Sequence, residues 1–204
     1  MTDRQIGAVL CDLDGVLRVW GELGEVDAAY GLPPGTVAGA AFRDERLLPA
    51  VTGQVTDEQW RAAVAADLVG VCGSTVRARE VVAAWGRQPS RVDPEVLALL
   101  ADVRRGVPVV LVSNGTTRLE ADLTALGLDA AFDAVVNTAR LGAAKPEARV
   151  YLAAAERVRV PPSACLFVDD SQGNTAAAEA LGMSGHHFRG AAGLRAALRG
   201  HGLI

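Results

Sequence analysis

The sequence predicts an α/β fold, a doubly wound parallel sheet with a small helical domain inserted into it. Four valine-rich apolar runs do not alternate with polar residues, and such runs predict strands buried on both faces of a parallel sheet. Helical patterns lie between most of these runs, and the alternation is typical of right-handed β-α-β connections. Nearly a hundred residues separate the first two runs. That interval is too long for one crossover, so we expect an insertion there.

The expected strands are short and rich in valine, leucine and alanine. They are Ile6–Cys11, Val107–Val112, Ala134–Val136 and Ala164–Val168, with a weaker fifth strand at Gly185–Phe188. None contains a charged residue, which favours strands covered on both faces over an edge that faces water.

The expected helices of the core carry start and stop signals. The clearest begins with Asp93 as N-cap and Pro94 at the first helical position, and Gly106 follows its end. The four helices are Pro94–Arg105, Thr117–Leu126, Pro146–Arg157 and Asn174–Leu181.

The sequence predicts that the long interval after the first strand is mostly helical. Turn residues separate three helical patterns, at Thr36–Phe42, Asp57–Val69 and Thr75–Trp85. We therefore expect a core domain formed by residues 1–18 and 87–204 and a helical domain formed by residues 19–86.

Charge and composition argue against two classes of partner. The 204 residues carry 20 basic and 24 acidic side chains, a net charge of −4, which gives no reason to expect nucleic acid or an anionic membrane. No apolar run approaches the roughly 18 residues of a membrane span, and acidic residues interrupt the N-terminus before a signal peptide could form. The cysteines Cys11, Cys72 and Cys165 are odd in number and far apart, so Cys11 and Cys165 are expected as buried thiols. We expect a soluble cytoplasmic protein.

Polar side chains follow the expected strands at the edge where ligands of open α/β sheets bind. Each group alone is common in turns or at helix starts, but turns do not explain four such groups at one edge. They are Asp12 and Asp14 after the first strand, Ser113 and Asn114 after the second, Lys145 after the third, and Asp169 and Asp170 after the fourth.

This set of residue types suits phosphoryl transfer. Neighbouring carboxylates repel one another, and Mg²⁺ relieves the repulsion because it prefers a few carboxylate oxygens and leaves positions for a phosphate. Ser113 can donate a hydrogen bond to a phosphate, Lys145 supplies a positive charge, and backbone N–H groups near Asn114 can add to an anion site. Asp12 can act as a covalent nucleophile. Asp14 can exchange protons with the leaving group and with water.

Four motifs in this order resemble those of the haloacid dehalogenase-like (HAD) hydrolase superfamily. The motifs are DLDGV at Asp12, SNG at Ser113, KP at Lys145, and DDSQGN with AAEALGM at Asp169–Met183. The resemblance covers Ile6–Leu17 and about Val92–Arg189.

Membership of this superfamily implies a role for each motif. Asp12 would form an aspartyl-phosphate, and Asp14 would be the general acid/base, with its carbonyl as a ligand of Mg²⁺. Ser113 and Lys145 would bind the phosphoryl group. Asp170 would be the main acidic ligand of Mg²⁺, with Asp169 as a ligand or support. Residues 19–86 stand where relatives carry a helical cap.

The resemblance favours a Mg²⁺-dependent phosphatase that acts on a small phosphorylated metabolite. Similar dehalogenases attack carbon without a metal and generally lack the second acid, which Asp14 supplies here. Phosphomutases share all four motifs, so that alternative stays open, as does a non-catalytic phosphate-binding module. Receiver domains of signalling pathways also bind Mg²⁺ with acids, but their acidic pair ends the first strand and a single acid ends a middle strand. The order of the acids in this sequence differs and argues against a receiver domain. Arg18 and Trp20 follow the first motif directly and are the candidate residues for substrate specificity.

Overall fold

The computed structural model describes residues 5–22 and 24–204, and its centre is a five-stranded parallel sheet in the order β5-β4-β1-β6-β7. The strands are β1 (Ala8–Cys11), β4 (Val109–Ser113), β5 (Ala134–Asn137), β6 (Cys165–Asp169) and β7 (Ser184–His187). All five predicted strands are present, with ends that differ from the predicted ones by at most two residues. The predicted doubly wound α/β fold is confirmed.

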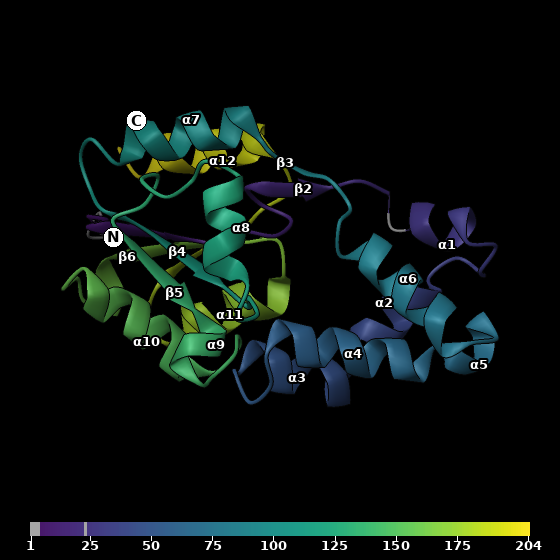
Figure 1. Ribbon diagram of the computed structural model, residues 1–204. Coiled ribbons are helices and arrows are strands. Elements are labelled where there is room, and N and C mark those ends of the chain that lie inside the picture. The colour runs from purple at the N-terminus through teal and green to yellow at the C-terminus, as the bar shows by residue number, and fades with distance from the viewer. Residues whose placement is uncertain (1–4, 23) are drawn as a thin grey trace.

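Helices cover both faces of the sheet (Figure 1). Alternate residues of β1, β4, β5 and β6 pack against opposite layers. Val9 and Cys11 lie in one apolar cluster with α7 (Pro94–Val103), α8 (Leu119–Ala125) and α12 (Ala191–Gly200). Ala8 and Leu10 lie in a second cluster with α10 (Ala148–Arg157) and α11 (Gln172–Ala180). Burial on both sides explains why the strands read as continuous apolar runs.

Short elements complete the core. The helix α9 (Thr138–Leu141) follows β5, and the 3₁₀ turn η1 (Pro162–Ala164) precedes β6. The start of α7 is as predicted, because the Asp93 carboxylate accepts hydrogen bonds from the N–H groups of Glu95 and Val96.

Among the described residues, six helices lie between β1 and α7 and form the helical insertion, which stands beyond one edge of the sheet (Figure 1). They are α1 (Glu25–Ala29), α2 (Thr36–Ala41), α3 (Asp44–Val51), α4 (Asp57–Asp67), α5 (Val69–Cys72) and α6 (Thr75–Trp85). Their buried side chains, among them Trp60, Val64 and Val81, form an apolar cluster separate from the two of the sheet.

Two strands that the sequence did not predict join the insertion to the core. They are β2 (Arg18–Trp20) and β3 (Ser90–Val92), which pair antiparallel with Arg18 opposite Val92. The predicted boundary between residues 18 and 19 falls within β2, and the one between residues 86 and 87 precedes β3. Both boundaries stay a prediction.

The predicted state of the cysteines is confirmed. Cys11 and Cys165, and also Cys72, are buried free thiols. Among the helices of the described residues, none is long and apolar enough to cross a membrane.

Candidate active site

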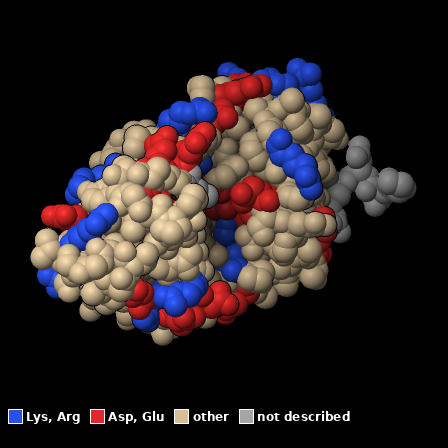
Figure 2. Space-filling view, turned by 90° about the vertical axis from the view of Figure 1, so that its right-hand side faces the viewer, with Lys and Arg blue, Asp and Glu red and all other residues tan. Residues whose placement is uncertain are grey.

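The candidate site lies in a cavity of about 690 Å³ between the carboxyl ends of the strands and the helical insertion. Figure 2 shows the face of the molecule that carries the insertion, where acidic and basic side chains lie in and around a hollow. Strand β1 is central in the sheet, between β4 and β6. The residues that follow these three strands therefore meet at the base of the cavity, as expected for an open α/β sheet.

Lys145 binds two of the predicted acids at once. Its Nζ lies 2.8 Å from Oδ1 of Asp12 and 2.7 Å from Oδ2 of Asp169, and it donates a further hydrogen bond of 3.1 Å to the carbonyl of Val112. Burial alone would lower the pKa of Lys145, but the charges of Asp12 and Asp169 outweigh it and hold that pKa above its usual value. The lysine therefore stays charged between the two carboxylates.

Asn114 fixes the loop that carries Lys145. Its Oδ1 accepts a hydrogen bond of 2.8 Å from the Lys145 N–H, and its Nδ2 donates one of 3.1 Å to the Lys145 carbonyl. The amide of Asn114 is thus used to position the lysine. The sequence predicted that Asn114 contributes to substrate binding, and this stays a prediction. Because the side-chain amide binds Lys145, the group that would bind substrate is the backbone N–H of Asn114. Ser113, at the end of β4, is buried and lines the cavity.

Three carboxylates form a cluster next to this lysine. Asp12, Asp169 and Asp170 each place an oxygen within 4.8 Å of the other two. Burial raises the pKa of Asp12 to about 7, with Asp169 adding to the rise and Lys145 opposing it. Burial and then Asp169 also raise the pKa of Asp170. The cluster thus holds more negative charge than one lysine neutralises, and a divalent cation fits it.

The two acids of the last motif differ in their surroundings. Asp169 is fully buried and accepts hydrogen bonds from Lys145, from the Asn174 side chain and from the Ser171 N–H. Asp170 is exposed. Asp169 is therefore oriented by three donors, whereas Asp170 keeps an open carboxylate.

Gly15 lets the first loop pass close to Asp170. The backbone at Gly15 has a φ of +80°, in the left-handed region that glycine favours. A Cβ at this position would lie 2.1 Å from Oδ2 of Asp170. A side chain would therefore both strain the loop and displace an acid of the cluster.

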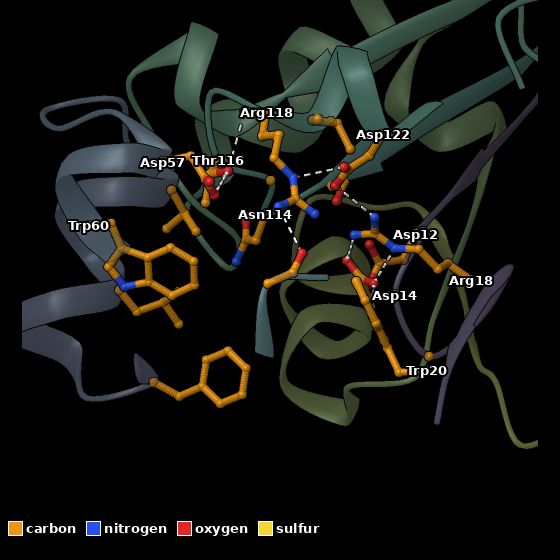
Figure 3. A pocket seen from close by; sticks show the side chains of 18 of the residues that line it. Asp12, Asp14, Arg18, Trp20, Asp57, Trp60, Asn114, Thr116, Arg118 and Asp122 are labelled. Carbon is orange, nitrogen blue, oxygen red and sulfur yellow. Dashed lines mark hydrogen bonds and ion pairs between the residues drawn. The ribbon is translucent and has the colours of Figure 1, made fainter. Parts of the chain in front are cut away.

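Asp14 faces Arg18 and Trp20 and is not one of the three clustered carboxylates. Arg18 donates from Nε and Nη2 to the two oxygens of Asp14, at 2.7 Å each, and Trp20 donates from Nε1 to Oδ1 at 2.6 Å. The remaining Nη1 of Arg18 bonds Asp122 at 3.0 Å (Figure 3). Arg18 is buried, and its guanidinium lies 4.6 Å from the centre of the Trp20 ring.

These contacts give Arg18 and Trp20 a role that the sequence did not predict, because both hold the carboxylate of Asp14. Both also line the cavity. Their predicted contact with substrate stays a prediction.

The helical insertion adds residues that sequence reasoning missed. Oδ1 of Asp57 accepts a hydrogen bond of 2.8 Å from the Thr116 hydroxyl, and the Asp57 N–H donates one of 2.9 Å to Oγ1 of Thr117. Oδ2 of Asp57 pairs with Nε of Arg61 at 2.5 Å. Asp57 thus ties the first turn of α4 to the loop after β4 (Figure 3). The one signal in the sequence is that Thr116 and Thr117 directly follow the SNG motif.

The sequence of the chain matches a known protein family. A family model described as haloacid dehalogenase-like hydrolase matches residues 6–182. The chain is 36% identical over 101 residues to the haloacid dehalogenase-like hydrolase domain-containing protein 3 of Mus musculus, and 33% identical over 103 residues to a phosphoserine phosphatase of Thermus thermophilus. These matches cover 47% and 48% of this chain but 39% and 41% of those proteins, so the chain spans less than half the length of these relatives.

Solved structures share the fold. A HAD family enzyme from Bacteroides thetaiotaomicron, in complex with magnesium and inorganic phosphate, matches with a TM-score of 0.73 at 22% identity, over 90% of this chain and 94% of that chain. An L-2-haloacid dehalogenase from Xanthobacter autotrophicus matches with a TM-score of 0.65 at 25% identity, over 89% of this chain and 76% of that chain. The family model covers most of the chain and agrees with the resemblance that the four motifs carry, so the chain belongs to the haloacid dehalogenase-like hydrolase family.

Proposed function

We propose that the protein is a phosphatase that hydrolyses the phosphate monoester of a small metabolite. The observation that carries the proposal is the placement of Asp12. This buried carboxylate lines the cavity next to the charged Nζ of Lys145, and a second acid, Asp14, follows two residues later. The names of two curated relatives, a phosphoserine phosphatase and a phosphatase of Mycobacterium tuberculosis, agree with this reaction class.

The reaction has two steps on this chain's own residues. In the first, an oxygen of Asp12 attacks phosphorus, the bond from phosphorus to the ester oxygen breaks, and Asp14 gives a proton to the leaving alcohol. In the second, Asp14 takes a proton from water, which attacks phosphorus and releases phosphate from Asp12. Lys145 and the Ser113 hydroxyl stabilise the charge on the phosphoryl oxygens in both steps. Asp14 must give up part of its bonding to Arg18 and Trp20 to do so.

The carboxylate cluster suits Mg²⁺. Asp12 and Asp170 would hold the ion, supported by Asp169, and the resemblance adds the backbone carbonyl of Asp14. When bound, Mg²⁺ supplies positive charge to the phosphoryl oxygens. A dehalogenase is less favoured, because attack on carbon gives no role to three clustered carboxylates.

The helical insertion would act as a cap over the cavity. Its residues close one side of the site and limit the access of water, which protects an aspartyl-phosphate from premature hydrolysis. In line with the composition, we propose a cytoplasmic protein whose partners are small molecules and include neither nucleic acid nor membrane.

Replacement of the nucleophile tests the proposal. Asp12→Asn is nearly isosteric, so we expect the thermal transition to be retained and release of phosphate from a panel of monoesters to fall by at least about 10³-fold. Removal of metal with EDTA should stop the wild-type enzyme, and added Mg²⁺ should restore it. Full activity in Asp12→Asn would refute the assignment of the nucleophile. Metal-independent release of chloride from a haloacid would instead identify a dehalogenase.

A further inference from the structure

We propose that the preferred substrate is the monoester of an uncharged alcohol that carries an aromatic or similarly bulky apolar group. The inference rests on the proposed function and adds to it the class of leaving group. Two independent features of the cavity support it, an aromatic wall on the insertion and the pairing of every described cation that lines the cavity.

The wall of the cavity contributed by the insertion is apolar. Phe42 and Trp60 each pack edge-on against Trp85, with ring centres 5.8 and 5.7 Å apart. Leu47 and Val51 extend the same wall. Figure 3 shows Trp60 and Asp12 on opposite sides of the cavity. A phosphoryl group at Asp12 would therefore point its alcohol toward rings that favour apolar and aromatic groups.

The Phe42 side chain in particular is available to a ligand. Phe42 is 49% exposed although its ring belongs to the aromatic wall, whereas Trp60 is 5% exposed. A bound apolar group would remove Phe42 from water, which is a favourable contribution to binding.

Every cation that lines the cavity, among the described residues, already pairs with an acid of the protein. Arg18 pairs with Asp14 and Asp122, and Lys145 pairs with Asp12 and Asp169. The other two lining cations are Arg61 and Arg118, which pair with Asp57 and Asp122, respectively.

Arg61 has contacts besides its ion pair. Besides its bond to Asp57, its guanidinium lies 5.7 and 5.6 Å from the ring centres of Trp60 and Trp85. A Cβ on Gly86 would lie 1.7 Å from its Nη1. The guanidinium thus fills the space beside Gly86 and is held there by Asp57 and the two rings.

Pairing of the cations disfavours a substrate with a second charge. A carboxylate or second phosphate on the leaving group would have to compete with an acid of the protein for a cation that is already paired, or enter the cavity without a counter-ion. Both are costly in a partly buried site. The same reasoning disfavours a phosphomutase, which must hold a bisphosphate.

Three matched esters test the aromatic wall and the pairing of the cations separately. They are 2-phenylethyl phosphate, 2-(4-carboxyphenyl)ethyl phosphate, which adds only a carboxylate, and ethyl phosphate, which lacks the ring. All three tryptophans of the chain, Trp20, Trp60 and Trp85, line the cavity, so their fluorescence reports binding there. Titrations use Asp12→Asn with Mg²⁺, in which the esters bind without turnover. Phosphate release by the wild-type enzyme is measured in parallel.

We expect 2-phenylethyl phosphate to bind about tenfold more tightly than either of the other two esters, a difference that corresponds to about 1.4 kcal/mol. Phe42→Ala, combined with Asp12→Asn, should remove most of the advantage over ethyl phosphate. Leu48→Ala is the matched control. It truncates a side chain of the same insertion that is 50% exposed and does not line the cavity, so the advantage should persist.

Each result has a distinct reading. Equal or tighter binding of the carboxylated ester would overturn the inference of an uncharged leaving group, and equal binding of ethyl phosphate would overturn the role of the aromatic wall. Absence of phosphate release from all three esters with the binding order intact would support this ligand class while refuting the proposed hydrolysis.

Discussion

The close approach of Gly15 to Asp170 makes the geometry of the carboxylate cluster sensitive to this one residue. We predict that Gly15→Ala lowers the affinity for Mg²⁺ and the rate of phosphate release by at least about tenfold, because the new Cβ would lie 2.1 Å from Oδ2 of Asp170. Calorimetric titration of Mg²⁺ and a phosphate-release assay would measure the two effects.

The strain of a left-handed alanine has to be separated from displacement of Asp170. Gly127→Ala provides the control, because Gly127 has a φ of +70° but a Cβ there would meet no atom within 4 Å. Both variants should lose about 1–2 kcal/mol of stability from backbone strain. Only Gly15→Ala should lose Mg²⁺ affinity, and an equal loss in both variants would contradict the role assigned to Asp170.

Residue types at strand ends were predictable, but the partners that orient them were not. Asp12, Lys145 and Asp169 stand out in the sequence because acids and a lysine follow apolar runs at one sheet edge. The bonds from Arg18 and Trp20 to Asp14 depend on a tight turn, in which the Arg18 N–H donates to the Leu13 carbonyl and β2 brings the chain back beside Asp14. Such contacts depend on backbone geometry, and no sequence periodicity encodes them.

Within the helical insertion, Asp67 links the end of α4 to the start of α3. Its carboxylate accepts hydrogen bonds from Nε of Arg46 at 2.7 Å and from Nη2 of Arg43 at 2.6 Å. The hydrogen bond from Arg46 is the main cause of a pKa below the ordinary value of Asp67. A carboxyl whose pKa is lower in the folded state stabilises the fold above its unfolded pKa of about 3.9, and that stability is lost as the pH falls through the folded value.

We therefore predict that Asp67→Asn lowers the free energy of unfolding by up to about 1 kcal/mol at pH 7, with a smaller difference near pH 3. Urea denaturation of both proteins at the two pH values measures the effect. A control is Glu45→Gln, since Glu45 pairs with Arg43 at the longer distance of 3.6 Å. A difference for Asp67→Asn that is the same at both pH values would show that shape, and not charge, is responsible.

Most of the elements that the sequence did not reveal are short. The helices α4 and α6 span 11 residues each, enough for a helical period to appear, and both were predicted. The missed strands β2 and β3 have three residues each, and α1 and α5 have five and four. Too few residues are present there for a pattern, so tertiary contacts decide the structure. The missed α3 contains Pro49, a residue that usually marks a helix end.

At the scale of the whole molecule, the site depends on where the insertion enters the core. It follows β1, the central strand, and both of its connections pass through the β2–β3 pair beside the carboxyl edge of the sheet. Six helices with an apolar cluster of their own therefore stand over the residues that follow β1, β4 and β6. The sequence predicted this insertion from its length, but not the bonds of Asp57 to Thr116 and Thr117, because these join segments some sixty residues apart.

Separate apolar clusters predict that the insertion and the sheet do not unfold together in the absence of ligand. Trp60 and Trp85 lie in or against the cluster of the insertion, and Trp20 lies in β2, so tryptophan fluorescence follows the insertion and its connection. Circular dichroism follows the helices of both parts. We expect the fluorescence transition at a lower guanidinium concentration than the main transition in circular dichroism, because the smaller cluster buries less apolar surface.

Mg²⁺ with inorganic phosphate should bring the two transitions together. A ligand in the cavity contacts both parts and binds only when both are folded, so it stabilises them as one unit. If Asp12 holds the metal as proposed, Asp12→Asn should bind it more weakly, and the two transitions of this variant should approach each other less at the same ligand concentrations. Coincident transitions in the ligand-free protein would contradict this account, since they would show that the β2–β3 pair and the Asp57 contacts already join insertion and sheet into one cooperative unit.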